Sequence, residues 1–276
     1  MPSRLIVSLM LSLALAGCGG QYILTVPDQV AQTGGQTVVV ARLQRNDFFV
    51  LAPPIEGAAL RLRVHEQGER AAYTDRLGYA GAAVPVPAQE GLYTLRIDHM
   101  DSEGDEAAAT APVYVWNAQT PVAAVDLDAL DTDSAQPGEA ARAALQKLAA
   151  RPVRIVYLTH RRINRHAEIH RRLAELNLPD GPVLLWQREF WHISYVPGLI
   201  PGIKIPTVKI ETRLVSQLSG LKQTLPKLQA GIAGSDAACR AFLAAGLKCI
   251  TLVPTRLDDP KVARADSWDA AVQAVP

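Results

Sequence analysis

Three polar residues in the second half of the chain stand at the ends of short hydrophobic runs. Asp126 closes one such run, Thr159 follows the next, and Asp236 comes after a glycine-containing stretch. Ligands of open parallel sheets bind outside the carboxyl ends of the strands. These residues are therefore the first candidates for a binding or catalytic site, and Asp128 adds a second carboxylate beside Asp126. A carboxylate pair of this spacing also occurs in exposed turns that follow a strand.

The elements that would position these residues alternate along the second half of the chain. Hydrophobic runs of strand length lie at 122–126, 153–158, 183–185, 230–233 and 248–253. Stretches of helical character separate them, at 138–150, 160–176, 207–225 and 236–245. Because parallel strands must be joined by a crossover, which is usually a helix, this order predicts an α/β domain with a parallel sheet.

The sequence pattern of the first half is typical of an antiparallel β-sandwich. Residues 60–64 alternate apolar and charged side chains with period two, as a strand with one solvated face does. Short β-prone runs separated by turn residues lie at 36–43, 58–65, 82–87, 92–98 and 111–116. The pattern at 74–80 and 91–95 resembles that of small immunoglobulin-like or prealbumin-like extracellular modules. We expect a non-catalytic all-β sandwich of the seven-strand type.

The N-terminal segment has the features of a bacterial lipoprotein signal. Arg4 precedes an apolar stretch, 5–16, that is shorter than the roughly 20 residues a membrane-spanning helix needs. The stretch leads into Leu-Ala-Gly before Cys18, which resembles the lipobox, where the cysteine is acylated and the leader is removed. This predicts a mature chain that begins at a palmitate-bearing Cys18 and is anchored in a lipid bilayer. An ordinary secretory signal is the alternative. Gly19 in place of Asp favours the outer membrane if the host is Gram-negative.

Composition excludes several classes of protein. Of the 276 residues, 49% are hydrophobic and 20% are charged, which is typical of a globular chain rather than a disordered one. The formal net charge of +1 argues against a protein that coats nucleic acid. Charge is uneven, with 7 basic and 12 acidic residues in 21–116 against 20 basic and 15 acidic residues in 117–276.

The change in charge occurs at a turn-rich stretch, 117–121, and indicates a boundary between two domains there. At about 100–200 residues per domain, the length also agrees with two domains. In order, we expect a signal peptide (1–17), the lipidated Cys18 with a tether (18–35), a β-sandwich domain (36–116), a linker (117–121) and an α/β domain (122–276).

Cysteine and histidine residues offer little for a metal centre. Cys239 and Cys249 lack the spacing of a zinc site. They are more typical of two small buried residues than of a disulfide, which an oxidising compartment would allow. His166 and His170 are one helical turn apart and could bind a transition metal. Glu168 points to another face of that helix, so we do not expect a complete site.

The order of motifs in the second half resembles the haloacid dehalogenase (HAD) superfamily. Residues 124–128 match its first motif, and 156–159 match its second, a hydrophobic strand that ends in Ser or Thr. Lys209 stands where the third motif has its lysine, and 230–236 resembles the fourth motif. The resemblance implies a HAD-like fold for the α/β domain.

The resemblance also implies phosphoryl transfer through an aspartyl-phosphate. Asp126 would be the nucleophile, and Asp128 would protonate the leaving group and later activate water. Thr159 would bind a phosphoryl oxygen, and Lys209 would offset negative charge. The implied ligands of a Mg²⁺ ion, which prefers oxygen, are Asp126, Asp128 and Asp236.

A narrower resemblance concerns the substrate. Residues 157–159, followed by 177–185, are similar to the lipin-like and actin-patch-type phosphatidate phosphatases. This implies a lipid phosphate such as phosphatidate as the substrate of a membrane-anchored hydrolase. The basic stretch 160–172 would suit anionic lipid headgroups, or it forms an ordinary solvated helix face.

Departures from the HAD pattern favour a second hypothesis. Leu130 stands where the family has a hydroxyl residue, and no proline follows Thr159 at the expected place. After Asp236, Cys239 and Arg240 occupy the region where a second acid is usual. The alternative is therefore a HAD-like lipoprotein without activity that serves binding or structure in the cell envelope.

Overall fold

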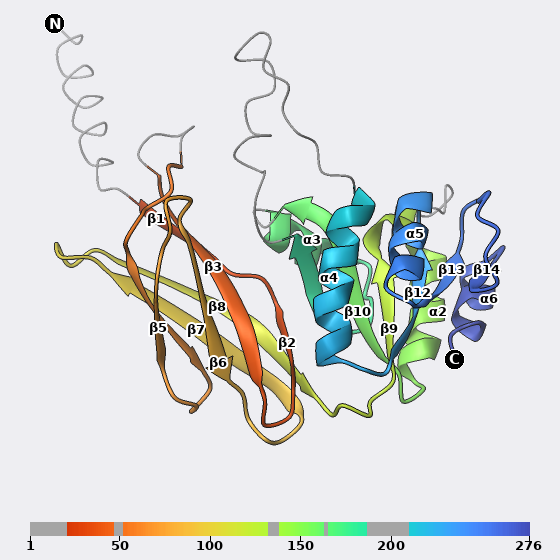
Figure 1. Ribbon diagram of the computed structural model, residues 1–276, viewed down its shortest axis with the longest axis horizontal. Coiled ribbons are helices and arrows are strands. Elements are labelled where there is room, and N and C mark those ends of the chain that lie inside the picture. Colours follow the sequence, from red (N-terminus) through yellow and green to blue (C-terminus); the bar gives the residue numbers. More distant parts are fainter. Residues whose placement is uncertain (1–20, 47–51, 132–137, 163–164, 187–209) are drawn as a thin grey trace, which may run out of the picture.

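The computed structural model describes residues 21–46, 52–131, 138–162, 165–186 and 210–276. The expected signal peptide, Cys18 and Lys209 lie outside these ranges. Figure 1 shows two parts side by side, a β-sandwich from the first strands and an α/β domain from the remainder of the chain. Within the described ranges, the helices are too short or too polar to cross a membrane.

The sandwich consists of a three-stranded sheet with the order β1-β3-β6 and a five-stranded sheet with the order β2-β8-β7-β4-β5. Its strands are β1 (Gln21–Thr25), β2 (Gln29–Gln32), β3 (Gln36–Asn46), β4 (Ala59–Val64), β5 (Arg70–Tyr73), β6 (Tyr79–Pro85), β7 (Gly91–Met100) and β8 (Glu106–Trp116). Both sheets contribute to one hydrophobic core. In β4 the period-two pattern buries Leu60, Leu62 and Val64 and exposes Arg61 and Arg63, as expected.

The sandwich differs from the expectation in two respects. The described residues form eight strands rather than seven, and β2 pairs with β8 in parallel. The segment 21–35, which we had assigned to a tether, contains β1 and β2, which pair with β3 and β8. The tether assignment is therefore wrong for these residues. Both strands are short, with five and four residues, so they carry too little alternation to be recognised locally.

The α/β domain is built on a six-stranded parallel sheet with the order β11-β10-β9-β12-β13-β14. Its strands are β9 (Val122–Asp126), β10 (Arg154–Arg162), β11 (Val183–Trp186), β12 (Leu228–Ala233), β13 (Lys248–Thr251) and β14 (Val262–Arg264). Its helices are η1 (Leu127–Asp131, a 3-10 helix), α2 (Glu139–Ala149), α3 (His166–Glu175), α4 (Ile210–Thr224), α5 (Asp236–Ala244) and α6 (Trp268–Gln273). The parallel sheet with helical crossovers confirms the predicted class, while β14 and α6 were not anticipated.

Helices cover both faces of this sheet (Figure 1). Helices α2, α3 and α6 pack on one face and α4 and α5 on the other, so each face has its own hydrophobic core. Strand β9 serves both cores, because Ala123 and Val125 point to the first and Val122 and Ala124 to the second. A strand that is buried on both faces must be apolar throughout, which explains the uninterrupted hydrophobic run that precedes Asp126.

The order of the strands creates a switch point between β9 and β12. From β9 the chain proceeds outward to β10 and β11, then returns to the other side of β9 and proceeds through β12, β13 and β14. The helices after β9 and β12 consequently lie on opposite faces. In such sheets ligands bind in the crevice at the carboxyl ends of the two strands that flank the switch. Asp126 is the last residue of β9.

The two parts of the molecule also share buried surface. Tyr114 and Trp116 near the end of β8 belong to the same hydrophobic core as Leu218 of α4. The hydroxyl group of Tyr114 donates a hydrogen bond to the Asp180 carboxylate (2.8 Å). The sandwich is therefore packed against the α/β domain and is not joined to it by the connecting stretch 117–121 alone.

Candidate active site

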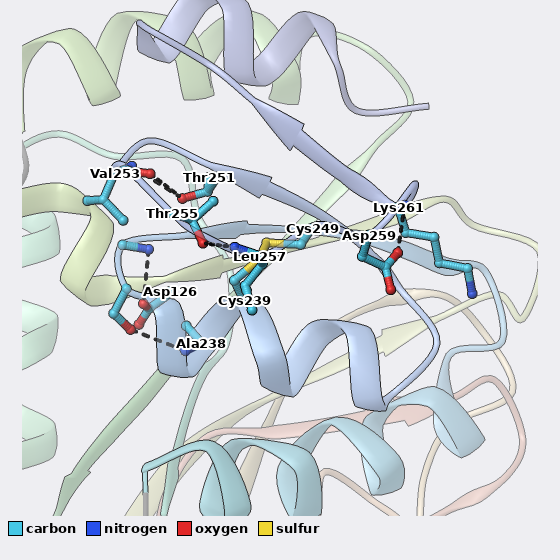
Figure 2. Close-up of a disulfide and its surroundings, with 12 residues drawn as sticks. Asp126, Ala238, Cys239, Cys249, Thr251, Val253, Thr255, Leu257, Asp259 and Lys261 are labelled. Carbon is cyan, nitrogen blue, oxygen red and sulfur yellow. Dashed lines mark hydrogen bonds between the residues drawn. A yellow bond between two sulfur atoms is a disulfide. The ribbon is translucent and has the colours of Figure 1, made fainter.

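Asp126 is nearly buried at the carboxyl end of an inner strand, with 2% of its surface exposed. Its Oδ1 atom accepts a hydrogen bond from the backbone N–H of Asp128 (3.3 Å), and its Oδ2 atom accepts one from the backbone N–H of Gly234 (3.2 Å). In Figure 2, Asp126 lies beside the first turn of α5, near Ala238. The carboxylate is thus held between the turn after β9 and the loop after β12.

The surroundings of Asp126 favour its neutral form. Burial, followed by the negative charge of Asp128, raises the pKa of Asp126 to about 7. The two backbone N–H groups counteract only part of this effect. Carboxyl groups with a pKa near neutrality are concentrated at functional sites. An ionised Asp126 would be stabilised by a cation placed close to it.

The loop after β12 approaches the Asp126–Asp128 turn so closely that only glycine fits. A Cβ atom on Gly234 would lie 2.2 Å from the backbone nitrogen of Ala129 and 2.4 Å from the carbonyl carbon of Asp128. Both are backbone atoms, so the contact cannot be relieved by a change of rotamer. The fold therefore brings Asp126, Asp128 and the loop that leads to Asp236 together at one edge of the sheet.

Asp236 is the first residue of α5 and follows the N-cap residue Ser235. Its Oδ1 atom is buried and has no hydrogen-bond partner among the described residues. Such an atom is costly unless water or a cation satisfies it. In the described part of the chain, however, Asp126, Asp128 and Asp236 do not form a group of ligand atoms within 4.8 Å of one another. The three carboxylates therefore do not make a preformed three-ligand site.

Thr159 lies on the strand adjacent to Asp126. In the parallel pair of β9 and β10, Leu158 is opposite Asp126, so Thr159 is one residue further toward the carboxyl edge. Thr159 is fully buried, and its Oγ1 atom accepts a hydrogen bond from the backbone N–H of Arg161 (3.1 Å). It therefore lies near Asp126, with its hydroxyl group engaged by Arg161 where the pairing of β10 with β11 becomes irregular.

The residues after Asp128 are apolar and point into the core. Ala129 and Leu130 are 0% and 2% exposed and belong to the core beneath α2. The hydroxyl group that the HAD pattern places here is thus replaced by packed apolar side chains. Lys209, the expected cation, lies outside the described residues.

Cys239 and Cys249 form a disulfide bond close to this edge of the sheet (Figure 2). Both residues are fully buried, Cys239 in α5 and Cys249 in β13, and their Cα atoms are 5.5 Å apart. Burial was expected, but the preference for free thiols was wrong, because α5 packs against β13 and brings the two side chains together. The bond ties the helix that begins at Asp236 to the sheet.

Gln217 of α4 is a residue of this edge that no sequence motif indicated. Its Nε2 atom donates a hydrogen bond to the carbonyl oxygen of Leu184 (3.2 Å) and lies 3.5 Å from that of Thr159. Its Oε1 atom is buried without a hydrogen-bond partner among the described residues. The side chain reaches from a helix to two neighbouring strands, β10 and β11, and only the fold reveals this proximity.

A separate group of ligating side chains consists of Asp28, His166 and His170. Sequence reasoning found the two histidines but no carboxylate, because Asp28 is 138 residues away from His166. Burial would raise the pKa of Asp28, but hydrogen bonds from both histidines and from the Val183 N–H outweigh it and lower that pKa.

The described residues also contain an acidic turn between β7 and β8, formed by Asp101, Glu103 and Asp105.

Comparison with known proteins assigns no family to the chain. No protein-family model and no curated protein matches it. Among solved structures, the tandem Ig repeats of Dlar are 14% identical (TM-score 0.27), and the match covers 40% of this chain and 59% of that chain. CopC from Methylosinus trichosporium OB3b is 10% identical (TM-score 0.23) over 36% of this chain and 95% of CopC. A 2,6-sialyltransferase of Photobacterium sp. JT-ISH-224 is 11% identical (TM-score 0.24) over 81% of this chain and 41% of the enzyme. Similarity at these TM-scores carries no inference about function.

Proposed function

We propose that the chain is a membrane-anchored phosphomonoester hydrolase that works through an aspartyl-phosphate on Asp126. The observation that carries the proposal is the position of this nearly buried carboxylate, at the carboxyl end of β9 and beside the switch point of the sheet. The HAD-like order of the motifs around Asp126, Thr159 and Lys209 supports the same reaction.

In the first step, the Asp126 carboxylate attacks the phosphorus atom of the ester, and the bond from phosphorus to the leaving oxygen breaks. Asp128 donates a proton to that oxygen, so the product leaves as an alcohol. In the second step, water attacks the aspartyl-phosphate, Asp128 accepts its proton, and Asp126 is regenerated as inorganic phosphate departs. The backbone N–H groups of Asp128 and Gly234 orient Asp126 throughout. Thr159 is proposed to bind a phosphoryl oxygen.

The carboxylates at this edge supply some of the oxygen ligands that a Mg²⁺ ion needs. The buried Asp236 Oδ1 atom has no hydrogen-bond partner among the described residues, and carboxylate oxygens are the ligands that Mg²⁺ prefers. We therefore propose Asp126 and Asp236 as ligands, with Asp128 nearby. When bound, the ion would offset the negative charge of the phosphoryl group. Lys209 is proposed to contribute positive charge as well.

We infer that the substrate is a lipid phosphate, such as phosphatidate, at an envelope membrane. The lipobox-like Cys18 supports an anchor in the bilayer. The buried Cys239–Cys249 disulfide supports an oxidising compartment such as the bacterial envelope. An anchored hydrolase would meet lipid phosphates in the plane of the membrane to which it is attached.

The test compares the full mature chain with Asp126→Asn. Asp269→Asn is the matched control, because Asp269 lies exposed in an ion pair with Lys147 (2.7 Å). With Mg²⁺, we expect the wild type and the control to release phosphate from p-nitrophenyl phosphate or from phosphatidate vesicles. Phosphate release should fall by about 1,000-fold or more in Asp126→Asn. Mg²⁺ should also raise the Tm of the wild type but not that of Asp126→Asn.

The second candidate function is a HAD-like envelope lipoprotein that binds without catalysis. The buried Ala129 and Leu130 and the separated carboxylates favour it. No phosphate release from any phosphomonoester, together with no Mg²⁺-dependent change in Tm, would support this candidate. Equal activity in Asp126→Asn and the wild type would instead show that another residue is the nucleophile.

A further inference from the structure

Asp28, His166 and His170 converge where the β-sandwich meets α3. His166 Nε2 lies 2.8 Å from Asp28 Oδ1, and His170 Nε2 lies 3.1 Å from the same oxygen. The two Nε2 atoms are 3.0 Å apart. Two imidazole nitrogens and one carboxylate oxygen thus surround a single position, and none of these residues belongs to the proposed catalytic site.

Hydrogen bonds alone do not account for this triangle. In the plane of its ring, each Nε2 atom carries either one hydrogen or one lone pair. If both nitrogens donate to Asp28, the 3.0 Å contact between His166 and His170 joins two donors. If one nitrogen accepts from the other, it no longer donates to Asp28. A cation at the centre would instead receive a lone pair from each of the three atoms.

We propose that Asp28, His166 and His170 bind one transition-metal ion of the Zn²⁺ type. Ligand atoms about 2.0–2.1 Å from such an ion, at angles of about 90–110°, are about 2.8–3.4 Å apart. The three distances between the residues, 2.8, 3.0 and 3.1 Å, lie within that range. Imidazole nitrogens with a carboxylate oxygen suit Zn²⁺ and its neighbours in the first transition row, whereas Mg²⁺ and Ca²⁺ prefer oxygen alone.

The surroundings support a metal in this position. The backbone N–H of Val183 donates a hydrogen bond to Asp28 Oδ2 (2.7 Å), which orients the carboxylate as outer-shell partners of metal ligands do. The Asp28 side chain is fully buried, while those of His166 and His170 are 17% and 35% exposed. The ion would therefore be reachable from solvent and keep a coordination position for water.

A metal ion here would join the two parts of the molecule. Asp28 lies between β1 and β2 of the sandwich, whereas His166 and His170 occupy the first turns of α3 in the α/β domain. The complete set of ligands exists only when the two parts are docked. Zn²⁺ should therefore favour the docked arrangement, and this stabilisation should increase with the concentration of Zn²⁺.

The experiment uses the full mature chain without a histidine tag, stripped of metals with EDTA and then dialysed. Isothermal titration with Zn²⁺ measures affinity and stoichiometry, and the visible spectrum of the Co²⁺-loaded protein reports nitrogen ligands. His170→Asn removes one ligand. His65→Asn is the matched control, because His65 is exposed in a turn at φ 49°, a conformation that asparagine adopts readily.

We expect one Zn²⁺ per chain for the wild type and for His65→Asn. Affinity should fall by more than about 100-fold in His170→Asn, since loss of an outer-shell partner alone costs about 10–100-fold. Zn²⁺ should raise the Tm of the wild type and of His65→Asn and leave that of His170→Asn unchanged. If His170→Asn does not fold, Asp28→Asn replaces it, because the amide oxygen can still accept the Val183 hydrogen bond.

Two results would overturn the proposal. The first is the absence of saturable Zn²⁺ binding by the wild type. The second is equal Zn²⁺ affinity in a folded ligand variant and in His65→Asn, which would place the ion on other residues. Both results are independent of phosphatase activity, so the outcome does not depend on the function proposed for Asp126.

Discussion

In the folded, metal-free protein, the carboxyl group of Asp126 keeps its proton to a higher pH than in the unfolded chain. Burial, followed by the charge of Asp128, raises its pKa to about 7, whereas an unfolded Asp has a pKa of about 3.9. Between these values the folded chain binds a proton that the unfolded chain has lost, so rising pH favours unfolding. The stabilising contribution of Asp126 is complete below about pH 4 and is lost as the pH rises through about 7.

We predict that Asp126→Asn removes this pH dependence. In urea unfolding with EDTA, the free energy of unfolding of the wild type should fall relative to that of the variant by about 2–4 kcal/mol between pH 4 and pH 8. Other titrating groups are common to both proteins and cancel in the difference. Asp269→Asn, which keeps Asp126, should retain the fall in the free energy of unfolding that the wild type shows between pH 4 and pH 8. A constant difference for Asp126→Asn would contradict the raised pKa.

At the scale of elements, the candidate active site depends on how closely η1 and the β12–α5 loop approach. Asp126 receives one hydrogen bond from each of them, so their separation sets the orientation of its carboxylate. Gly234 allows this close approach, because a side chain at position 234 would collide with the backbone of Ala129. The disulfide between α5 and β13 holds the helix that follows the loop.

We predict that Gly234→Ala lowers the free energy of unfolding by about 1–3 kcal/mol, the usual cost of an overpacked position. It should also abolish Mg²⁺-dependent phosphatase activity, because the loop must move away from Asp126. Gly220→Ala is the matched control, since a Cβ atom there in α4 has no neighbour within 4 Å. It should raise stability by about 0.5–1 kcal/mol through helix propensity. Urea unfolding measures the stability of both variants. Equal stability of Gly234→Ala and Gly220→Ala would contradict the close contact at Gly234.

For the whole molecule, the position of β1 determines how the protein would sit on a membrane. The first described strand begins at Gln21, only three residues after Cys18. At no more than about 3.6 Å per residue, the sandwich would lie within about 11 Å of an acylated Cys18. A lipid anchor would therefore hold the β-sandwich itself against the bilayer surface.

We predict that the mature chain is acylated at Cys18. Cells grown with labelled palmitate should incorporate the label into the wild type, which should be found in the membrane fraction. Cys18→Ala should lose both the label and the membrane association. Retention of either by the variant would contradict the lipoprotein assignment. Cys249→Ser, which affects only the internal disulfide, should keep the label and so serves as the control.

The sequence by itself determined the features that depend on local periodicity. Alternation in 60–64 predicted a strand with one solvated face, which β4 shows, and the uninterrupted run before Asp126 predicted a buried strand. The alternation of strands and helices predicted the parallel sheet, and the carboxyl-end rule directed attention to Asp126 and Thr159. The HAD-like activity, the Mg²⁺ ion and the lipid substrate stay predictions.

Only the tertiary structure decided which residues far apart in the chain meet. Asp28 meets His166 and His170 across about half of the sequence, because the segment between β1 and β2 docks against α3. Cys239 meets Cys249 because α5 packs on β13. Contacts of this kind are set by strand order and by the packing of elements, and a sequence pattern records only the periodicity within each element.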